Sequence, residues 1–224
     1  MIIESIECHL LSSKYGDGNT LGQPLGVKTI AILELRTKCG ISGFGEAYAG
    51  IYTPDLVNTI TNDIAKKFIG IKIKDILEER NHHFVPFVSR NGLYQSIYGA
   101  IEICILDAFA KGEGVPIWKL FSDTPNTDLR FYWSGGSAAF TPEKIADEVK
   151  NLNSFYHGYK LRVGHQSWEI DEKRIEAAKN NLGDKHLMID AIMGSLRPAW
   201  QLNDLIEKEV FLKSISPYWL EEPF

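Results

Sequence analysis

The chain has 224 residues, of which 44% are hydrophobic and 24% charged, and its formal net charge at pH 7 is −5. These values indicate a folded, water-soluble protein with one large domain or two modest ones. The acidic balance and the lack of a lysine- or arginine-rich block argue against nucleic acid and anionic membranes as partners. No apolar run approaches the ~18–20 residues of a membrane span, and the N-terminus lacks the features of a secretory signal, so we expect a cytoplasmic protein.

The first half of the chain predicts three strands followed by three helices. Alternating apolar residues predict the strands, at residues 2–10, 28–37 and 41–48. Helical spacing predicts the helices, one starting at Pro54 and the others at about 74–84 and 93–111. The short turns between the strands favour an antiparallel meander.

Apolar stripes predict the buried faces of two of these helices. The stripes are Leu56, Ile60, Ile64 and Phe68 on the first helix, and Ile97, Ala100, Ile101, Cys104, Ile105 and Ala108 on the third. The three cysteines, Cys8, Cys39 and Cys104, are odd in number and lack the spacing of metal ligands. We therefore interpret them as buried, reduced side chains.

From about residue 129 the pattern changes to alternating strands and helices. The strands are predicted at residues 129–133, 159–163, 187–190 and 217–221, and the helices at about 142–152, 170–181 and 198–210. Strand–helix units of ~30 residues are typical of a parallel sheet or barrel. We therefore expect an α/β protein, with an α+β domain at residues 1–125 and a β/α region at residues 126–224.

Two cations lie on one of the predicted parallel strands. Lys160 and Arg162 flank Leu161, and residues two apart in a strand face the same side. If Leu161 packs outward against helices, both cations point inward, where carboxylates, the anionic ligands of a metal or an anionic substrate must offset their charge. The alternative is that both side chains face solvent at a sheet edge.

Two acids end the next two predicted strands. Asp190 and Glu221 are 31 residues apart, which corresponds to one strand–helix unit. Because the C-terminal ends of the strands form the active-site face of a β/α barrel, both carboxylates are expected close enough to share one ion. Hard oxygen ligands suit Mg²⁺, so Asp190 and Glu221 are candidate metal ligands. The alternative is that each acid caps the following helix.

Further motifs follow one another in a specific order. They are Gly40–Ala47, Ala100–Gly112, Gly114–Leu120, Ser134–Gly136, Lys160–Gly164, Asp171 with Arg174, Gly183–Asp184, Asp190–Ala191 and Glu221–Pro223. In this order and spacing they resemble the mandelate racemase and muconate-lactonizing family of the enolase superfamily. The resemblance covers the whole chain and implies an α+β capping domain followed by part of a TIM-like (β/α) barrel.

The resemblance implies an Mg²⁺-dependent enzyme that removes the proton α to a carboxylate and stabilises the enediolate. Acid-sugar dehydration is the favoured reaction. Racemisation, epimerisation and cycloisomerisation share its first step, and a non-catalytic relative or fragment is a further alternative. Lys160 and Arg162 match the family's Lys-x-Lys segment and are the catalytic candidates, with Asp190 and Glu221 as metal ligands. The implied partners are a small carboxylate such as a sugar acid and further copies of the chain in a homo-oligomer.

Three features depart from the family pattern. Arg162 stands where the family often has its lysine base, and because arginine stays protonated in proteins it suits binding of the substrate carboxylate or support of Lys160. Ile192 stands where the family often has asparagine. The chain stops at Phe224, before a third metal ligand and an Asp–His pair, so we expect an incomplete barrel that is inactive by itself.

Two segments are candidates for enclosing a substrate. Residues 13–26 are rich in turn residues, and long loops of this kind are often lids. By the resemblance, this loop and residues 50–53 approach the barrel mouth, where Tyr15 and Tyr52 offer hydroxyls to a polyhydroxy substrate. The alternatives are a surface connection for the loop and packing at the domain junction for the tyrosines.

Overall fold

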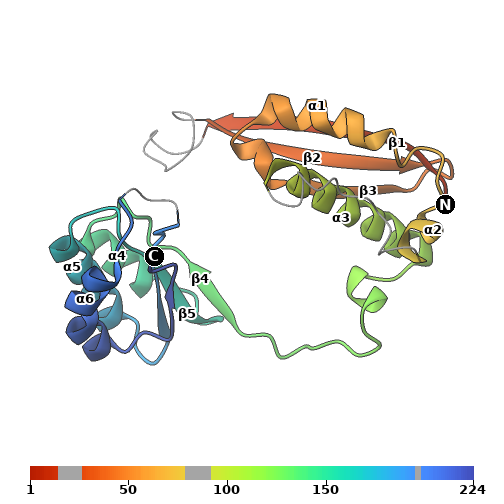
Figure 1. The fold of residues 1–224 in the computed structure, drawn as a ribbon. Helices are drawn as coiled ribbons and strands as arrows, with labels where there is room; N and C mark the ends of the chain where they lie inside the picture. The colour runs from red at the N-terminus through yellow and green to blue at the C-terminus, as the bar shows by residue number, and fades with distance from the viewer. Residues whose placement is uncertain (15–26, 79–91, 195–197) are drawn as a thin grey trace. The chain divides into compact units, whose positions relative to one another are not determined.

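The computed structural model describes residues 1–14, 27–78, 92–194 and 198–224. The chain divides into two compact units, Met1–Pro125 and Asn126–Phe224 (Figure 1). The first unit combines an antiparallel sheet with helices, and the second combines a parallel sheet with helices. The mixed α/β architecture predicted from the sequence is therefore confirmed.

A three-stranded antiparallel sheet in the order β1-β2-β3 forms the frame of the first unit. Its strands are β1 (Ile3–Lys14), β2 (Val27–Thr37) and β3 (Ser42–Ala47). β1 runs four residues beyond its predicted end because it pairs with β2 as far as Lys14 and Val27. Alternate residues of β2 face opposite sides, so Leu33 and Leu35 are fully buried while Arg36 is exposed.

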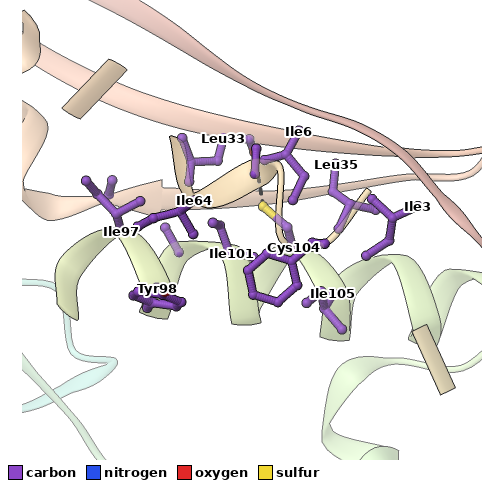
Figure 2. Close-up of a cluster of buried hydrophobic side chains, with 14 of the residues drawn as sticks. Ile3, Ile6, Leu33, Leu35, Ile64, Ile97, Tyr98, Ile101, Cys104 and Ile105 are labelled. Atoms are coloured by element: carbon purple, nitrogen blue, oxygen red, sulfur yellow. Dashed lines mark hydrogen bonds between the residues drawn. The ribbon is translucent and has the colours of Figure 1, made fainter. Parts of the chain in front are cut away.

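Helices pack with this sheet around one hydrophobic core. They are α1 (Pro54–Ala65), α2 (Ile73–Glu78) and α3 (Leu93–Glu113), with short 3₁₀ turns η1 (Tyr48–Ile51) and η3 (Ile117–Leu120). The predicted apolar stripe of α3 is buried in the core beside Leu33 and Leu35 (Figure 2). α3 approaches β3 closely because the strand presents Gly43 and Gly45, where an added Cβ would overlap backbone atoms of α3.

Of the predicted apolar stripe of the first helix, Ile64 and Phe68 are buried and Ile60 packs against the core, but the prediction for Leu56 is wrong. The helix buries Val57, Thr61, Ile64 and Ala65, whereas Leu56 is 52% exposed. The stripe that includes Thr61 has helical spacing as good as the purely apolar one. A pattern based on apolar residues alone passes over it because threonine carries a hydroxyl.

The prediction that all three cysteines are buried is also wrong. Cys104 is buried in the core, Cys8 is partly exposed and Cys39 is exposed. Cys39 lies in the tight turn between β2 and β3, where Gly40 supplies the left-handed backbone at φ 85°. A turn of this kind lies at the surface whatever the polarity of its side chains.

α3 is long and apolar enough to cross a membrane by length and composition alone. Half of its apolar window is buried within the first unit, where Ile97, Ile101 and Cys104 pack in the core. The core helix of a soluble protein meets the same criterion, so α3 gives no reason to infer a membrane span.

The second unit is built on a parallel sheet in the order β4-β5-β6-β7. Its strands are β4 (Phe131–Ser134), β5 (Tyr156–Arg162), β6 (His186–Asp190) and β7 (Leu220–Glu221). The helices between them are α4 (Pro142–Lys150), α5 (Trp168–Asn181) and α6 (Leu202–Ile215). Tyr159, Leu161 and Ile189 of the sheet form one core with Ile145 of α4 and Ile175 of α5. The unit therefore has the strand–helix repeat that the sequence predicts.

Local signals set the helix boundaries of the second unit. The Thr141 side chain caps α4, and Pro142 occupies its first turn. Gly183, at φ 64°, follows the end of α5. α6 begins at Leu202, four residues later than predicted, because Gln201 and Asp204 form a capping box at that point.

Candidate active site

The ends of β5, β6 and β7 bring one lysine and two acids together. In the parallel register Arg162 pairs with Asp190, and Asp190 pairs with Glu221. Lys160 Nζ lies 3.0 Å from Asp190 Oδ2 and 3.0 Å from each carboxylate oxygen of Glu221. The facing oxygens of the two acids are therefore at most about 6 Å apart, which is twice the distance that joins each to Nζ.

Alternation along β5 explains why Lys160 reaches this cluster. Tyr159, Leu161 and Val163 are fully buried in the core that the sheet shares with its helices. Lys160 and Arg162 therefore face the opposite side of the sheet. Lys160 is only 8% exposed, and the two carboxylates compensate the cost of burying its charge.

The two acids hold Lys160 in its charged form. Burial alone lowers the pKa of Lys160, but the hydrogen bonds and charges of Glu221 and Asp190 outweigh burial, and the net shift is upward. The hydrogen bond from Lys160 in turn lowers the pKa of Glu221. A lysine that acts as a base needs a lowered pKa, whereas this arrangement favours the ammonium form of Lys160.

Asp190 is fixed by the loop that follows it. Its Oδ1 accepts a hydrogen bond from the backbone N–H of Ile192 at 3.0 Å, which leaves Oδ2 for Lys160. Ile192 and Glu222 adopt left-handed backbone angles, with φ 48° and φ 46°. A β-branched residue rarely enters this region, and such strain tends to occur at functional sites. The residue type of Ile192 gives no sequence signal for this backbone.

Trp219 is a site residue that the sequence analysis missed. Its indole Nε1 donates a hydrogen bond to Glu221 Oε2 at 3.2 Å. Trp219 lies two positions before Glu221, immediately before β7. The alternation that groups Lys160 with Arg162 could have placed Trp219 and Glu221 on one side in the same way.

Arg162 is partly buried, and its guanidinium donates to neutral groups. Nη1 donates to the carbonyl oxygen of Gly135 at 3.3 Å, and Nη2 donates to Ser134 Oγ at 3.4 Å. In the described parts of the chain Arg162 forms no ion pair with a carboxylate. Its charge can therefore interact with an anionic group from outside the chain.

The two tyrosines predicted to bind substrate belong to the first unit. Tyr52 is exposed, and its hydroxyl lies 3.0 Å from that of Tyr48. Tyr15, like most of the loop at residues 13–26, lies outside the described residues. The role of both tyrosines in enclosing a substrate stays a prediction.

The donor set at the strand ends fits a hard divalent cation. Asp190 and Glu221 offer carboxylate oxygens, the ligand type that Mg²⁺ prefers, and both already surround one cationic group, the Lys160 ammonium. The residues that the structure describes contain no cluster of three or more His, Cys, Asp or Glu side chains suited to a metal. Two carboxylate ligands are therefore what these residues could contribute.

Comparisons with known proteins show which families the chain resembles. Residues 144–224 match the family model described as Enolase C-terminal domain-like. The chain is 26% identical over 206 residues to the L-talarate/galactarate dehydratase of Salmonella typhimurium, an overlap of 90% of this chain and 50% of that protein. By these matches the chain is similar to members of the enolase superfamily. It is also 24% identical over 199 residues to a hydrophobic dipeptide epimerase of Citrifermentans bemidjiense, with 85% of this chain and 52% of that protein covered.

Solved structures of enolase superfamily proteins share the fold over the full chain. A superfamily member from Polaromonas sp. JS666 aligns with a TM-score of 0.80 at 26% identity, covering 100% of this chain and 59% of that one. An enolase from alpha pretobacterium bal199, solved with bound Mg, aligns with a TM-score of 0.79 at 19% identity, covering 99% of this chain and 62% of that one. The chain spans about half the length of the curated relatives it matches. It therefore carries the α+β unit and part of the superfamily's barrel.

Proposed function

We propose that the full-length protein is an Mg²⁺-dependent acid-sugar dehydratase whose reaction begins with removal of the proton α to the substrate carboxylate. The observation that carries the proposal is the convergence of Lys160, Asp190 and Glu221 at the ends of three adjacent parallel strands. The similarity to a talarate/galactarate dehydratase supports a sugar acid as the substrate. We also propose that the protein is a cytoplasmic homo-oligomer, as the resemblance implies.

Each site residue has a distinct part in this proposal. Asp190 and Glu221 would hold the metal ion, with the remaining ligands supplied from outside the described residues. When bound, a divalent cation offsets the negative charge that develops on the substrate carboxylate. Lys160 moves the α-proton at Nζ: the ammonium form delivers a proton and the amine form accepts one. Arg162, a permanent cation that forms no ion pair with a carboxylate among the described residues, orients an anionic group of the substrate.

Enclosure of the substrate belongs to the same proposal. We propose that the loop at residues 13–26 and the segment at 50–53 close over the site and that Tyr15 and Tyr52 contact substrate hydroxyls. Enclosure excludes water and strengthens the charge interactions on which the reaction depends.

A second candidate is racemisation or epimerisation, which the similarity to a dipeptide epimerase favours. It shares the first proton removal and differs in returning a proton to the same carbon, whereas cycloisomerisation differs again in its second step. A non-catalytic role is a third candidate, because Arg162 replaces the family's lysine base.

The test uses the full-length protein with Mg²⁺ and a panel of aldonic and aldaric acids in D₂O. Dehydration releases a 2-keto-3-deoxy acid, whereas a racemase or epimerase gives α-deuterated substrate without loss of water. Asp190→Asn and Glu221→Gln should each lower Mg²⁺ affinity by at least about 100-fold in calorimetry. The matched control is Glu209→Gln, which removes an exposed carboxylate of α6 paired with Lys213.

Lys160→Met tests the proposed part of Lys160 in proton transfer. It should abolish α-proton exchange for one substrate stereoisomer, and unchanged exchange would assign the proton transfer to another residue. Wild-type protein that binds no Mg²⁺ would contradict the proposal and favour the non-catalytic role.

A further inference from the structure

Arg174 of α5 is fully buried and holds the backbone that follows β4, residues 135–140. Its Nε donates to the carbonyl oxygen of Phe140 at 2.8 Å, and its Nη2 donates to that of Ser137 at 2.8 Å. Its Nη1 pairs with Oδ1 of Asp171, also fully buried, at 2.5 Å. One guanidinium therefore satisfies two main-chain carbonyls and one carboxylate in a place without solvent.

The same ion pair reaches the loop after β5. The second oxygen of Asp171, Oδ2, accepts a hydrogen bond from the backbone N–H of Gly164 at 2.7 Å. Gln166 of this loop donates its side-chain Nε2 to the carbonyl oxygen of Ala138 at 2.7 Å. The loops that follow β4 and β5 are thus fixed to each other and to α5.

The segment that Arg174 holds also supplies hydrogen-bond acceptors to Arg162. The Arg162 backbone N–H donates to the carbonyl oxygen of Gly136 at 3.2 Å, and its Nη1 donates to that of Gly135 at 3.3 Å. Glu148 of α4 holds the same segment by accepting the backbone N–H of Gly136 at 2.8 Å. The position of the Arg162 guanidinium therefore depends on acceptors that other side chains keep in place.

We propose that Arg174 is a positioning residue, which acts through segment 135–140 on the guanidinium of Arg162. The inference rests on the proposed function, in which Arg162 orients an anionic group of the substrate. Two long hydrogen bonds to neutral acceptors hold a flexible arginine weakly, so its orientation requires acceptors that do not move. Displacing a substrate-orienting group by about 1 Å can cost about 100-fold in rate.

The experiment compares Arg174→Met with Arg174→Lys in the full-length protein. Methionine removes the ion pair with Asp171 and both hydrogen bonds to backbone carbonyls. Lysine keeps a cation for Asp171 but lacks the planar guanidinium that donates to several acceptors at once. The matched control is Lys208→Met in α6. Lys208 is also buried, but it donates to the carbonyl oxygen of Asp204 and lies over the rings of Trp168 and Trp200. Both methionine variants remove a buried cation of the second unit, and only one touches segment 135–140.

The first readout is amide hydrogen exchange, which needs no substrate. Arg174→Met should raise exchange at Gly135, Gly136 and Arg162 by at least about 10-fold relative to the rest of the second unit, with a smaller rise for Arg174→Lys. Lys208→Met should leave hydrogen exchange at these amides unchanged relative to the rest of the second unit. If both methionine variants raise exchange evenly across the unit, Arg174 has only a general structural role and the inference is wrong.

The second readout is a double-mutant cycle with Arg162→Gln on the kcat of the dehydration. Arg174→Met alone should lower kcat by about 10- to 100-fold, and in the Arg162→Gln background it should cause no further loss. If Arg174→Met lowers kcat as much in the Arg162→Gln background as in the wild type, the inference is overturned. If no sugar acid is turned over by wild-type protein, the proposed function fails, and the exchange readout still decides the role of Arg174.

Discussion

A hydrogen bond of 3.2 Å joins the indole Nε1 of Trp219 to Oε2 of Glu221. The ammonium of Lys160 lies beside it, between Glu221 and Asp190. A cation that binds Glu221 changes the charge directly next to this ring. Adding Mg²⁺ to the full-length protein should therefore change its intrinsic fluorescence, and Trp219→Phe should remove most of that change.

The same variant should lower Mg²⁺ affinity by about 10-fold, less than the loss of a ligand, since Trp219 is a partner of the ligand and not itself a ligand. Trp118→Phe, in the η3 turn of the first unit, is the control and should keep the fluorescence response. A response that survives in Trp219→Phe would show that the cation does not bind at Glu221.

The close approach of β3 to α3 predicts opposite effects for two glycine substitutions. A Cβ at Gly43 would overlap the backbone of Cys104 and Ala108, so Gly43→Ala should lower the free energy of unfolding by about 1–3 kcal/mol. An added Cβ at Gly99, within α3, would have no atom within 4 Å. Gly99→Ala should therefore raise the free energy of unfolding by about 0.5–1 kcal/mol. Denaturant unfolding measures both, and equal changes would contradict the close contact.

The cysteines should differ in reactivity. Burial raises the pKa of Cys104 to about 12, whereas Cys39 is exposed and the hydrogen bond with Thr37 lowers its pKa. Because the thiolate is the reactive form, iodoacetamide should label Cys39 first in the native protein and Cys104 only after unfolding. Mass spectrometry of timed samples reads the order, and Cys39→Ser should remove the fast phase. Early labelling of Cys104 would count against the packing in Figure 2.

Glu34 should make stability depend on acid pH. Hydrogen bonds from Arg36, joined by His9 and Ser42, overcome burial and lower the pKa of Glu34 from 4.5 to about 2. A carboxyl whose pKa is lower in the folded state stabilises the fold above its unfolded pKa, and this contribution is lost as the pH falls through the folded pKa. The difference in Tm between wild type and Glu34→Gln should therefore be largest above about pH 5 and shrink towards pH 2. A difference that does not change with pH would contradict the network.

Sequence patterns predicted elements better than details of packing. The stripe of α3 was correct because its members are all apolar, whereas α1 turns a face with Thr61 inward and leaves Leu56 exposed. Ile192 shows a second limit: its backbone is left-handed, and its neighbours Ala191 and Met193 donate backbone hydrogen bonds to the carbonyl oxygens of Glu221 and Glu222. No local pattern records constraints that come from residues outside the segment itself.

For the candidate site, the sequence by itself determined which residue types stand at the strand ends and that Lys160 and Arg162 share one side of β5. Strand alternation and the common direction of parallel strands are local rules, and they are sufficient for that result. The tertiary structure decided that Lys160 is held as an ammonium between Asp190 and Glu221. It also decided that Arg174 holds the backbone segment to which Arg162 donates hydrogen bonds. These outcomes depend on distances of about 3 Å between groups far apart in the sequence, and only packing of the whole unit sets such distances.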